Sequence, residues 1–401
     1  MATIIRQSYI DKIERYLGKE TIIVLVGQRR VGKSCMMKMI RDRKKADDCN
    51  NIIFIDKEKR EFDNIQTYQD LNDYIGEHFQ SDKHNYILID EIQDIKEFER
   101  SIRNYRTEPN TDIIITGSNA RMLSNELSTL IGGRYKEIYI QSLSYNEFLE
   151  FHQLSDNDEA LALYIQYGGL PGLAKIGLEE DDAREYQMDI YHTVLLKDVI
   201  MRNQIRNVPF LENLVRFLAD NTGKLISANS IAKYMKSQGE SITSTAIINY
   251  ISFLCEAYIL HKVNRYDIHG KRIFETNDKF YFEDNGIRNA IAGGTREGDI
   301  EKVIENIIYQ NLIRLGYQVY VGQLQAGEID FVCTKPGGER IYVQASYIIA
   351  DDATREREFG NLRSIKDNYP KYVISMTPLL TQNDNDGITH LHLRKFLTEG
   401  I

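Results

Sequence analysis

Residues 27–34 read GQRRVGKS and match the pattern G-x-x-x-x-G-K-[ST], whose residue types are suited to holding phosphate groups. The glycines let backbone N–H groups curve around an anion, the lysine ammonium reaches the outer phosphates, and the hydroxyl can ligate Mg²⁺. The segment follows the apolar run IIVLV and precedes a helix-like run, as this motif requires. The predicted nucleotide contacts are Gly27, Gln28, Arg29, Arg30, Val31, Gly32, Lys33, Ser34 and Cys35.

A second candidate element is the run YILIDEIQ, in which Asp90 and Glu91 directly follow an apolar strand. Alone, an acidic pair at a strand end is usually a solvated turn. Together with a phosphate-binding loop, we expect Asp90 and Ser34 to hold a Mg²⁺ ion, and Glu91 to polarise the water that attacks the γ-phosphorus. The two elements predict ATP and Mg²⁺ as cofactors.

A third apolar run, IIITGS, ends at Ser118 and Asn119. A polar side chain at this strand end can sense the γ-phosphate or the attacking water. The same two residues can instead cap the helix that begins near ARML, because Ser and Asn are favoured N-cap residues. Both interpretations remain open at this point.

The apolar runs between Glu20 and about Leu143 alternate with helix-period segments, which predicts an α/β domain with a parallel sheet over residues 1–143. Residues 144–210 have helical spacing, interrupted by GGLPG at 168–172, and are expected to form a lid. Residues 211–290 show helices followed by a hairpin, the order of a winged helix-turn-helix. Residues 291–401 alternate helix and strand, which predicts a small α/β domain.

Composition limits the class of protein. The 401 residues suffice for two or three domains at roughly 100 to 200 residues each. Fifty Lys and Arg against 59 Asp and Glu give a net charge of −9, which argues against a surface that is basic throughout. The four cysteines form no C-x-x-C pair, and no apolar run approaches the length of about 18 residues typical of a membrane helix. We expect a cytoplasmic protein with no membrane partner.

The segments GQRRVGKS, ILIDEIQ, IIITGSNA, GGRY and YGGLPG, in this order, resemble a family of bacterial and archaeal AAA-type ATPases over nearly the whole chain. The resemblance implies an active site between subunits of a homo-oligomer, with a hexamer as the candidate assembly. It implies that Arg134 contacts the γ-phosphate of a neighbouring subunit, with Arg121 as the second candidate. The alternative for Arg134 is a surface salt bridge. GGLPG carries no arginine, so a further phosphate contact from that segment is not expected.

The expected recognition helix, residues 243–256, contains no Lys or Arg, which weakens a role in reading bases. The hairpin after it is rich in basic residues: Lys262, Arg265, His269, Lys271, Arg272 and Lys279. Such a patch can contact DNA phosphates, or it can be an ordinary solvated face. The candidate DNA contacts are Lys262, Arg265, Lys271 and Arg272.

The C-terminal segment resembles the restriction-endonuclease-like PD-(D/E)xK core, in which acidic side chains bind Mg²⁺ and a lysine positions the water. Glu305 and Asp330 match the acidic positions of that pattern. Gln344 stands where Asp or Glu is expected, and Ser346 stands in place of the lysine. We therefore expect a nuclease-like domain without cleavage activity, retained for binding. The alternative is an unrelated α/β module with ordinary surface acids.

These features together predict a Mg²⁺-dependent ATPase that couples ATP binding and hydrolysis to engagement of DNA, with branched or junction DNA as a candidate substrate. One alternative is a nucleotide-dependent switch or scaffold that acts on a protein partner. Another is an active Mg²⁺-dependent nuclease, which needs chemistry that Gln344 and Ser346 do not supply.

Overall fold

The computed structural model describes residues 4–118, 133–239, 242–268, 270, 272–294, 297–325, 327–378 and 387–401; of residues 272, 274–276 and 297 only the backbone is described. The chain divides into two compact units. The N-terminal unit comprises residues 1–141 and 256–258, and the C-terminal unit comprises residues 142–255 and 259–401. The first unit thus ends close to residue 143, where the sequence predicts the end of the first domain.

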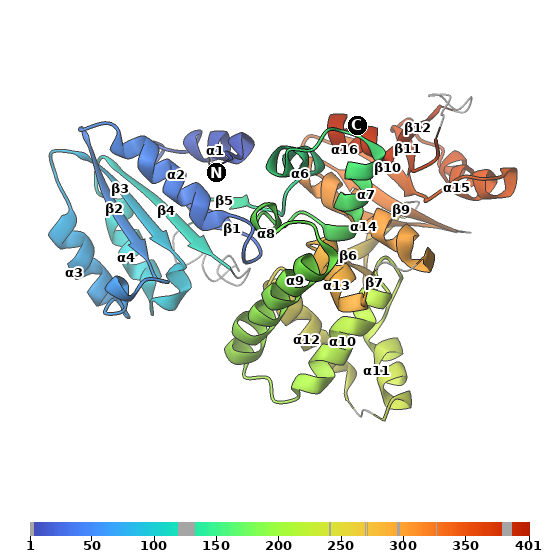
Figure 1. Ribbon diagram of the computed structural model, residues 1–401, viewed down its shortest axis with the longest axis horizontal. Helices are drawn as coiled ribbons and strands as arrows, with labels where there is room; N and C mark the ends of the chain where they lie inside the picture. The colour runs from blue at the N-terminus through green and yellow to red at the C-terminus, as the bar shows by residue number, and fades with distance from the viewer. Residues whose placement is uncertain are drawn as a thin grey trace. The chain divides into compact units, whose positions relative to one another are not determined.

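A five-stranded parallel sheet forms the centre of the N-terminal unit, as the alternating apolar runs predict (Figure 1). Its strand order is β2-β3-β4-β1-β5, so β4 lies between the strand before the phosphate-binding loop and the strand that ends at Asp90. Asp56 pairs in register with Asp90, which places both carboxylates at the same edge of the sheet. The strands are β1 (Ile22–Val26), β2 (Asn50–Asp56), β3 (His84–Asp90), β4 (Thr111–Gly117) and β5 (Tyr135–Tyr139).

Helices cover both faces of this sheet, which is why all five residues of β1 are buried. Ile23 and Leu25 pack with α1 and α2, whereas Ile22, Val24 and Val26 pack with α3 and α4 on the opposite face. Figure 1 shows these helices beside the strands. They are α1 (Gln7–Glu14), α2 (Lys33–Lys45), α3 (Tyr68–His78) and α4 (Phe98–Arg106).

The C-terminal unit begins with the helical segment that the sequence predicts after residue 143. A capping box starts its first helix: the Glu147 N–H donates to the Ser144 hydroxyl at 3.2 Å, and the Glu147 carboxylate accepts the Ser144 N–H at 2.8 Å. The helices of this segment are α6 (Tyr145–His152), α7 (Asp158–Tyr167), α8 (Leu173–Ile176) and α9 (Glu180–Val194), followed by the π-helical turns Leu195–Met201.

Three helices, α10 (Val208–Asp220), α11 (Ala228–Ser237) and α12 (Ser244–Glu256), then precede the hairpin of β6 (Leu260–Asp267) and β7 (Arg272–Phe282). The structure differs from the expected division at residue 290, because this hairpin belongs to the sheet of the following segment. Strand β6 pairs with β8, with Arg265 opposite Val321. The backbone groups of an edge strand favour such pairing, and the sequence alone does not show which strand supplies it.

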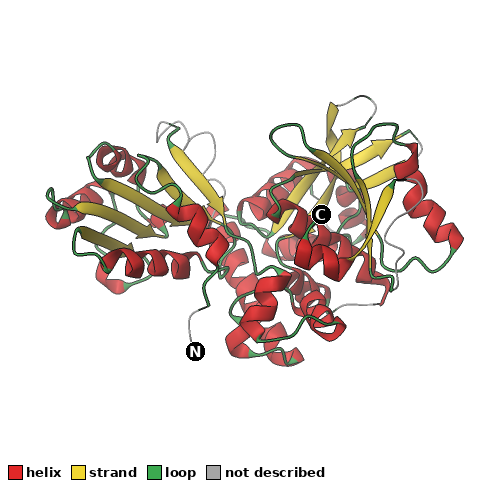
Figure 2. Ribbon diagram, turned by 90° about the horizontal axis from the view of Figure 1, so that it is seen from above, coloured by secondary structure: helices red, strands yellow, loops and turns green. Residues whose placement is uncertain are grey.

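The resulting seven-stranded mixed sheet has the order β12-β11-β10-β9-β8-β6-β7 and appears as a curved surface in Figure 2. Its further strands are β8 (Gln318–Leu324), β9 (Gly327–Thr334), β10 (Arg340–Ala345), β11 (Lys371–Ser375) and β12 (Ile388–His392). The remaining helices are α13 (Asn285–Ala292), α14 (Ile300–Arg314), α15 (Asp352–Ser364) and α16 (Leu393–Glu399).

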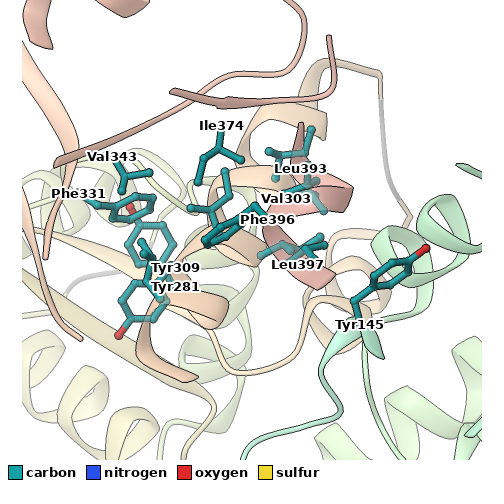
Figure 3. Close-up of a cluster of buried hydrophobic side chains, with 14 of the residues drawn as sticks. Tyr145, Tyr281, Val303, Tyr309, Phe331, Val343, Ile374, Leu393, Phe396 and Leu397 are labelled. Atoms are coloured by element: carbon teal, nitrogen blue, oxygen red, sulfur yellow. The ribbon is translucent and has the colours of Figure 1, made fainter. Parts of the chain in front are cut away.

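One hydrophobic core joins this sheet to α14 and α16 (Figure 3). Val303 of α14 and Phe396 of α16 are fully buried in it. The rings of Tyr281 and Tyr309 stack with their centroids 4.5 Å apart, and Phe331 lies against both. This core holds β7, β9 and α14 in fixed relation, and these three elements carry the acidic residues discussed below.

Candidate functional site

The phosphate-binding loop joins β1 to α2, and two of its glycines are required by its shape. Gly27 has φ +139°, and a Cβ at this position would lie 2.1 Å from the carbonyl oxygen of Ile140. Gly32 has φ +104° and is the N-cap of α2. Other residues adopt such φ values only with strain. The loop therefore turns sharply and presents the N-terminus of α2, where backbone N–H groups favour an anion.

Lys33 lies inside this loop with 4% of its surface exposed. Its ammonium group donates to the carbonyl oxygens of Gly27 and Gln28, both at 2.8 Å. Next to it, the Gln28 side-chain oxygen is buried and has no hydrogen-bond partner within the part of the chain that the structure describes. Carbonyl oxygens are weak partners for a full positive charge, so anionic phosphate oxygens would be better acceptors.

Asp90 and Glu91 lie at the end of β3, where their order in the sequence predicts them. The Asp90 carboxylate accepts hydrogen bonds from the hydroxyls of Ser34 and Thr116, so the two predicted Mg²⁺ ligands are adjacent. Burial raises the pKa of Asp90, and the nearby charges of Glu91 and Asp56 act in the same direction. A cation beside Asp90 would relieve both effects. The residues present therefore fit a Mg²⁺ ion.

Thr116 is a site residue that the motifs do not include. Its hydroxyl donates to Asp90 and accepts the backbone N–H of Glu91 at 2.9 Å. Glu91 has φ +53°, a backbone conformation that this hydrogen bond helps to hold. The sequence could have indicated this residue only through its position, as a polar residue near the end of the apolar run IIITGS.

The Glu91 carboxylate is held by two neighbours. The Gln93 amide donates to it, and the Arg29 guanidinium lies 3.9 Å from it. Arg29 also lies 3.8 Å from Glu58. Its side chain therefore faces the catalytic glutamate candidate, a role that the phosphate-binding pattern does not assign to this position.

Arg6, far from the motif in the sequence, contacts the loop through its side chain. It is 5% exposed, and its guanidinium donates to the carbonyl oxygens of Val31 at 3.1 Å and Gln141 at 2.8 Å. No local pattern could have identified it, because its role depends on the contact between α1 and the loop.

The remaining predicted positions of this site divide as follows. Val31 is fully buried in the core beside α2, whereas Arg30 and Cys35 are exposed. Ser118 is 1% exposed directly after β4, and Arg134 is exposed where β5 begins. Asn119 and Arg121 lie outside the described residues.

The acidic residues of the C-terminal unit do come together. Glu305 of α14 and Asp330 of β9 share one partner, the ammonium group of Lys279, at 2.8 and 3.2 Å. Glu328, which the pattern does not include, lies 2.6 Å from the same nitrogen. Lys279 is 3% exposed, so its expected place in a surface basic patch is wrong. Burial raises the pKa of Glu305 to about 7, against the opposing effect of Lys279.

Gln344 lies on the neighbouring strand β10, and Ser346 directly follows that strand. The Gln344 amide donates to Glu358 at 3.0 Å, and its oxygen accepts the N–H of Asp330. The Ser346 hydroxyl is buried and has no hydrogen-bond partner among the described residues. Across the described ranges, no three His, Cys, Asp or Glu side chains are grouped for a metal ion.

Two further basic side chains of the hairpin, Lys262 and Arg265, are described. Lys262 is half-exposed and pairs with Asp278 at 3.1 Å. Arg265 is partly buried on a strand with neighbours on both sides. Lys271 and the side chain of Arg272 are not described.

The GGLPG turn has a structural partner in Asp284. The Asp284 carboxylate accepts the N–H of Gly169 at 2.9 Å and the N–H of Ile287 at 3.1 Å, which caps α13. A Cβ at Gly168 would lie 2.5 Å from the same carboxylate. The glycines of this turn are therefore explained by close packing within the C-terminal unit.

Burial raises the pKa of Asp284 from 3.8 to about 6. Between these pH values the folded chain keeps a proton that the unfolded chain loses. The free energy of unfolding therefore falls as pH rises, by about 3 kcal/mol in total. We expect Asp284→Asn to be less stable than the wild type near pH 4, because one acceptor is lost, but to lack this pH dependence. Melting temperatures of both proteins from pH 4 to 7 test this; parallel curves would contradict it.

Comparison with known proteins places the chain in a class. A family model described as an AAA domain matches residues 19–149, and one described as a domain of unknown function matches residues 158–298. A solved Walker-type ATPase of Pyrococcus abyssi has a TM-score of 0.53, covering 72% of this chain and 96% of that chain. At 14% identity this likeness concerns the fold alone. The N-terminal unit is an AAA-type P-loop ATPase domain.

Two relatives resemble nearly the whole chain. An uncharacterized protein of Haemophilus influenzae is 33% identical over 406 residues, which is 99% of either chain. An uncharacterized protein of Methanocaldococcus jannaschii is 25% identical over 371 residues, covering 88% of this chain and 81% of the relative. The chain belongs to the family of the Haemophilus influenzae protein. No helix within the described residues has the length and apolar character to cross a membrane.

Proposed function

We propose that this protein is a Mg²⁺-dependent ATPase that couples ATP binding and hydrolysis to engagement of DNA. The observation that carries the ATPase part is the meeting of Lys33, Ser34, Asp90 and Glu91 at one edge of the parallel sheet. Cation, hydroxyl and carboxylates in this arrangement are the parts that phosphoryl transfer requires.

Each residue has a distinct role in the proposed reaction. Lys33 exchanges its carbonyl partners for phosphate oxygens when ATP binds. Ser34 and Asp90 would hold Mg²⁺, which neutralises charge that develops on the phosphate oxygens. Glu91 orients and polarises the attacking water, and Thr116 keeps the backbone at Glu91 in the required conformation.

Support for DNA engagement comes from the helices α10–α12 and the hairpin that follows them, the element order of a winged helix. Lys262 and Arg265 are the described candidates for phosphate contact, with Lys271 and Arg272 as further candidates. Because nuclease-like folds often serve branched substrates, junction or fork DNA is the proposed target.

The experiment that tests this is a comparison of duplex, single-stranded and four-way junction DNA. Binding is measured by electrophoretic mobility with and without a non-hydrolysable ATP analogue, and steady-state ATP turnover is measured with each DNA. We expect junction DNA to bind most tightly and to stimulate turnover. If none of these DNAs changes the rate of ATP turnover, coupling to DNA is excluded.

A second candidate function is a nucleotide-dependent switch or scaffold for a protein partner. The exposed surface of α11 and α12 favours it: Tyr234 is 46% exposed and Ile248 is 57% exposed, and α12 carries no Lys or Arg. Apolar side chains at the surface suit a protein interface better than a phosphate backbone. ATP turnover indifferent to DNA, with no mobility shift, would favour this function.

We further propose a homo-oligomer, with a hexamer as the candidate, in which Arg134 completes the neighbour's site. Arg134→Ala is then expected to lower ATP turnover by about 10³-fold or more. Adding a Glu91→Gln subunit, which keeps Arg134, should restore part of the activity, because mixed interfaces regain one complete site. Sedimentation must show that the variants assemble. If an assembled mixture recovers no ATP turnover, Arg134 acts within its own subunit.

We also propose that residues 291–401 form a nuclease-like domain that does not cleave DNA. The amide of Gln344 and the hydroxyl of Ser346 supply neither the charge of a Mg²⁺ ligand nor that of a lysine. Incubation of the full chain with Mg²⁺ or Mn²⁺ and labelled junction DNA should give no product. Product that is lost in Asp330→Ala would establish a nuclease instead.

A further inference from the structure

Arg29 is the third residue of the phosphate-binding loop, and its side chain faces acidic residues at the edge of the parallel sheet. Its guanidinium lies 3.9 Å from the Glu91 carboxylate and 3.8 Å from the Glu58 carboxylate, through two different nitrogen atoms. The Arg29 side chain is 16% exposed. The next residue, Arg30, has φ +69° and is exposed. The two loop arginines therefore have different surroundings, and the one that faces the catalytic candidate is Arg29.

Glu91 is the more firmly held partner of this contact. Its N–H donates to the Thr116 hydroxyl at 2.9 Å, and its Oε2 atom accepts a hydrogen bond from the Gln93 amide. Arg29 approaches the same Oε2 atom, but at a distance greater than that of a hydrogen bond. Glu58, whose side chain is 58% exposed, lies at a similar distance. The guanidinium is therefore attracted by both acids, and neither acid accepts a hydrogen bond from it.

The position of the γ-phosphate follows from the proposed roles of the loop and of Glu91. The loop wraps the phosphates, and the attacking water must lie between the Glu91 carboxylate and the γ-phosphorus, at a hydrogen-bond distance of about 2.6–3.2 Å from the carboxylate. Arg29 belongs to the loop and lies beside the same carboxylate. Its long side chain can therefore reach the γ-phosphate by a small movement away from Glu91 and Glu58.

A terminal phosphate is a better partner for the Arg29 guanidinium than either carboxylate. It carries more negative charge than a carboxylate and offers three acceptor oxygens. The planar guanidinium can donate to two of these oxygens at once. ADP lacks the third phosphate, so the arginine keeps its two acidic neighbours when ADP is bound. A contact made by Arg29 would therefore distinguish ATP from ADP.

We propose that Arg29 binds the γ-phosphate of ATP within its own subunit and exchanges the Glu91 and Glu58 carboxylates for this contact. Glu91 then keeps its hydrogen bonds with Gln93 and Thr116 but loses its cationic neighbour, which makes the carboxylate a stronger base toward the attacking water. This inference rests on the proposed ATPase function and adds the residue that recognises the third phosphate. It differs from the arginine contact proposed across the subunit interface.

The test compares the binding of ADP and of a non-hydrolysable ATP analogue to the full chain in the presence of Mg²⁺. Each nucleotide displaces a fluorescent ADP analogue, which gives both dissociation constants without turnover. Arg29→Gln should weaken binding of the ATP analogue by at least about tenfold and leave the affinity for ADP unchanged. Arg29→Lys keeps the charge but not the planar guanidinium, so it should recover part of the loss.

Two further variants separate a γ-phosphate contact from damage to the loop. Lys33→Ala should weaken binding of both nucleotides, because a lysine at this position of the motif reaches the β- and γ-phosphates. Arg41→Gln, which removes an ion pair with Asp42 on α2, should bind both nucleotides as the wild type does. If Arg29→Gln weakens both nucleotides equally, or weakens neither, this inference is overturned and the ATPase proposal stands. A wild type that binds neither nucleotide overturns both.

Discussion

Replacing Glu91 by glutamine is expected to leave ATP binding intact and to lower kcat by about 10²- to 10⁴-fold. Glu91 is 6% exposed, its backbone N–H bonds to Thr116, and its carboxylate is held by Gln93 and Arg29. Glutamine has the same shape and keeps these contacts in part, but it cannot polarise water as an anion does. The change should therefore act on the chemical step and not on the ground state.

The measurement combines equilibrium binding of a fluorescent ATP analogue with steady-state phosphate release. Glu97→Gln is the matched control, because Glu97 follows closely in the chain, has a similar left-handed backbone and is solvent-exposed. Wild-type turnover in Glu91→Gln would show that another group activates the water.

Replacing Lys33 by alanine is expected to weaken ATP binding by about 10- to 150-fold, the equivalent of about 1.5–3 kcal/mol for a hydrogen bond to a charged group. The Lys33 ammonium is buried within the loop and donates to the carbonyl oxygens of Gly27 and Gln28. ATP supplies anionic oxygens in their place, so the lysine contributes to the bound ground state. Turnover should fall as well, because the same charge stabilises the transferred phosphoryl group.

The control for this variant is Lys45→Ala, at the exposed last turn of the same helix. It should bind ATP as the wild type does. If Lys33→Ala bound ATP with unchanged affinity but lost turnover, the lysine would act only in the transition state, and the contrast with Glu91→Gln would disappear.

The sequence by itself determined the elements of the candidate ATP site that are local. A loop of eight residues brings Gly27, Gly32, Lys33 and Ser34 together through covalent spacing alone, and a parallel sheet places the ends of its strands at one edge. Asp90 could therefore be assigned beside Ser34 before any contact was known, and the hydrogen bond between their side chains agrees with that assignment.

The tertiary structure alone decided the contacts that depend on which elements pack together. Arg6, at the start of α1, contacts the phosphate-binding loop, and Thr116 of β4 contacts Asp90; neither has a spacing to the loop that a pattern could detect. Lys279 is surrounded by basic residues in the sequence. In the structure its side chain is buried, because alternation along β7 directs it toward α14 and β9. The hairpin likewise belongs to the C-terminal sheet, because the backbone of β6 pairs with that of β8. Burial and strand pairing are set by distant segments, and a charge pattern read along one segment cannot contain that information.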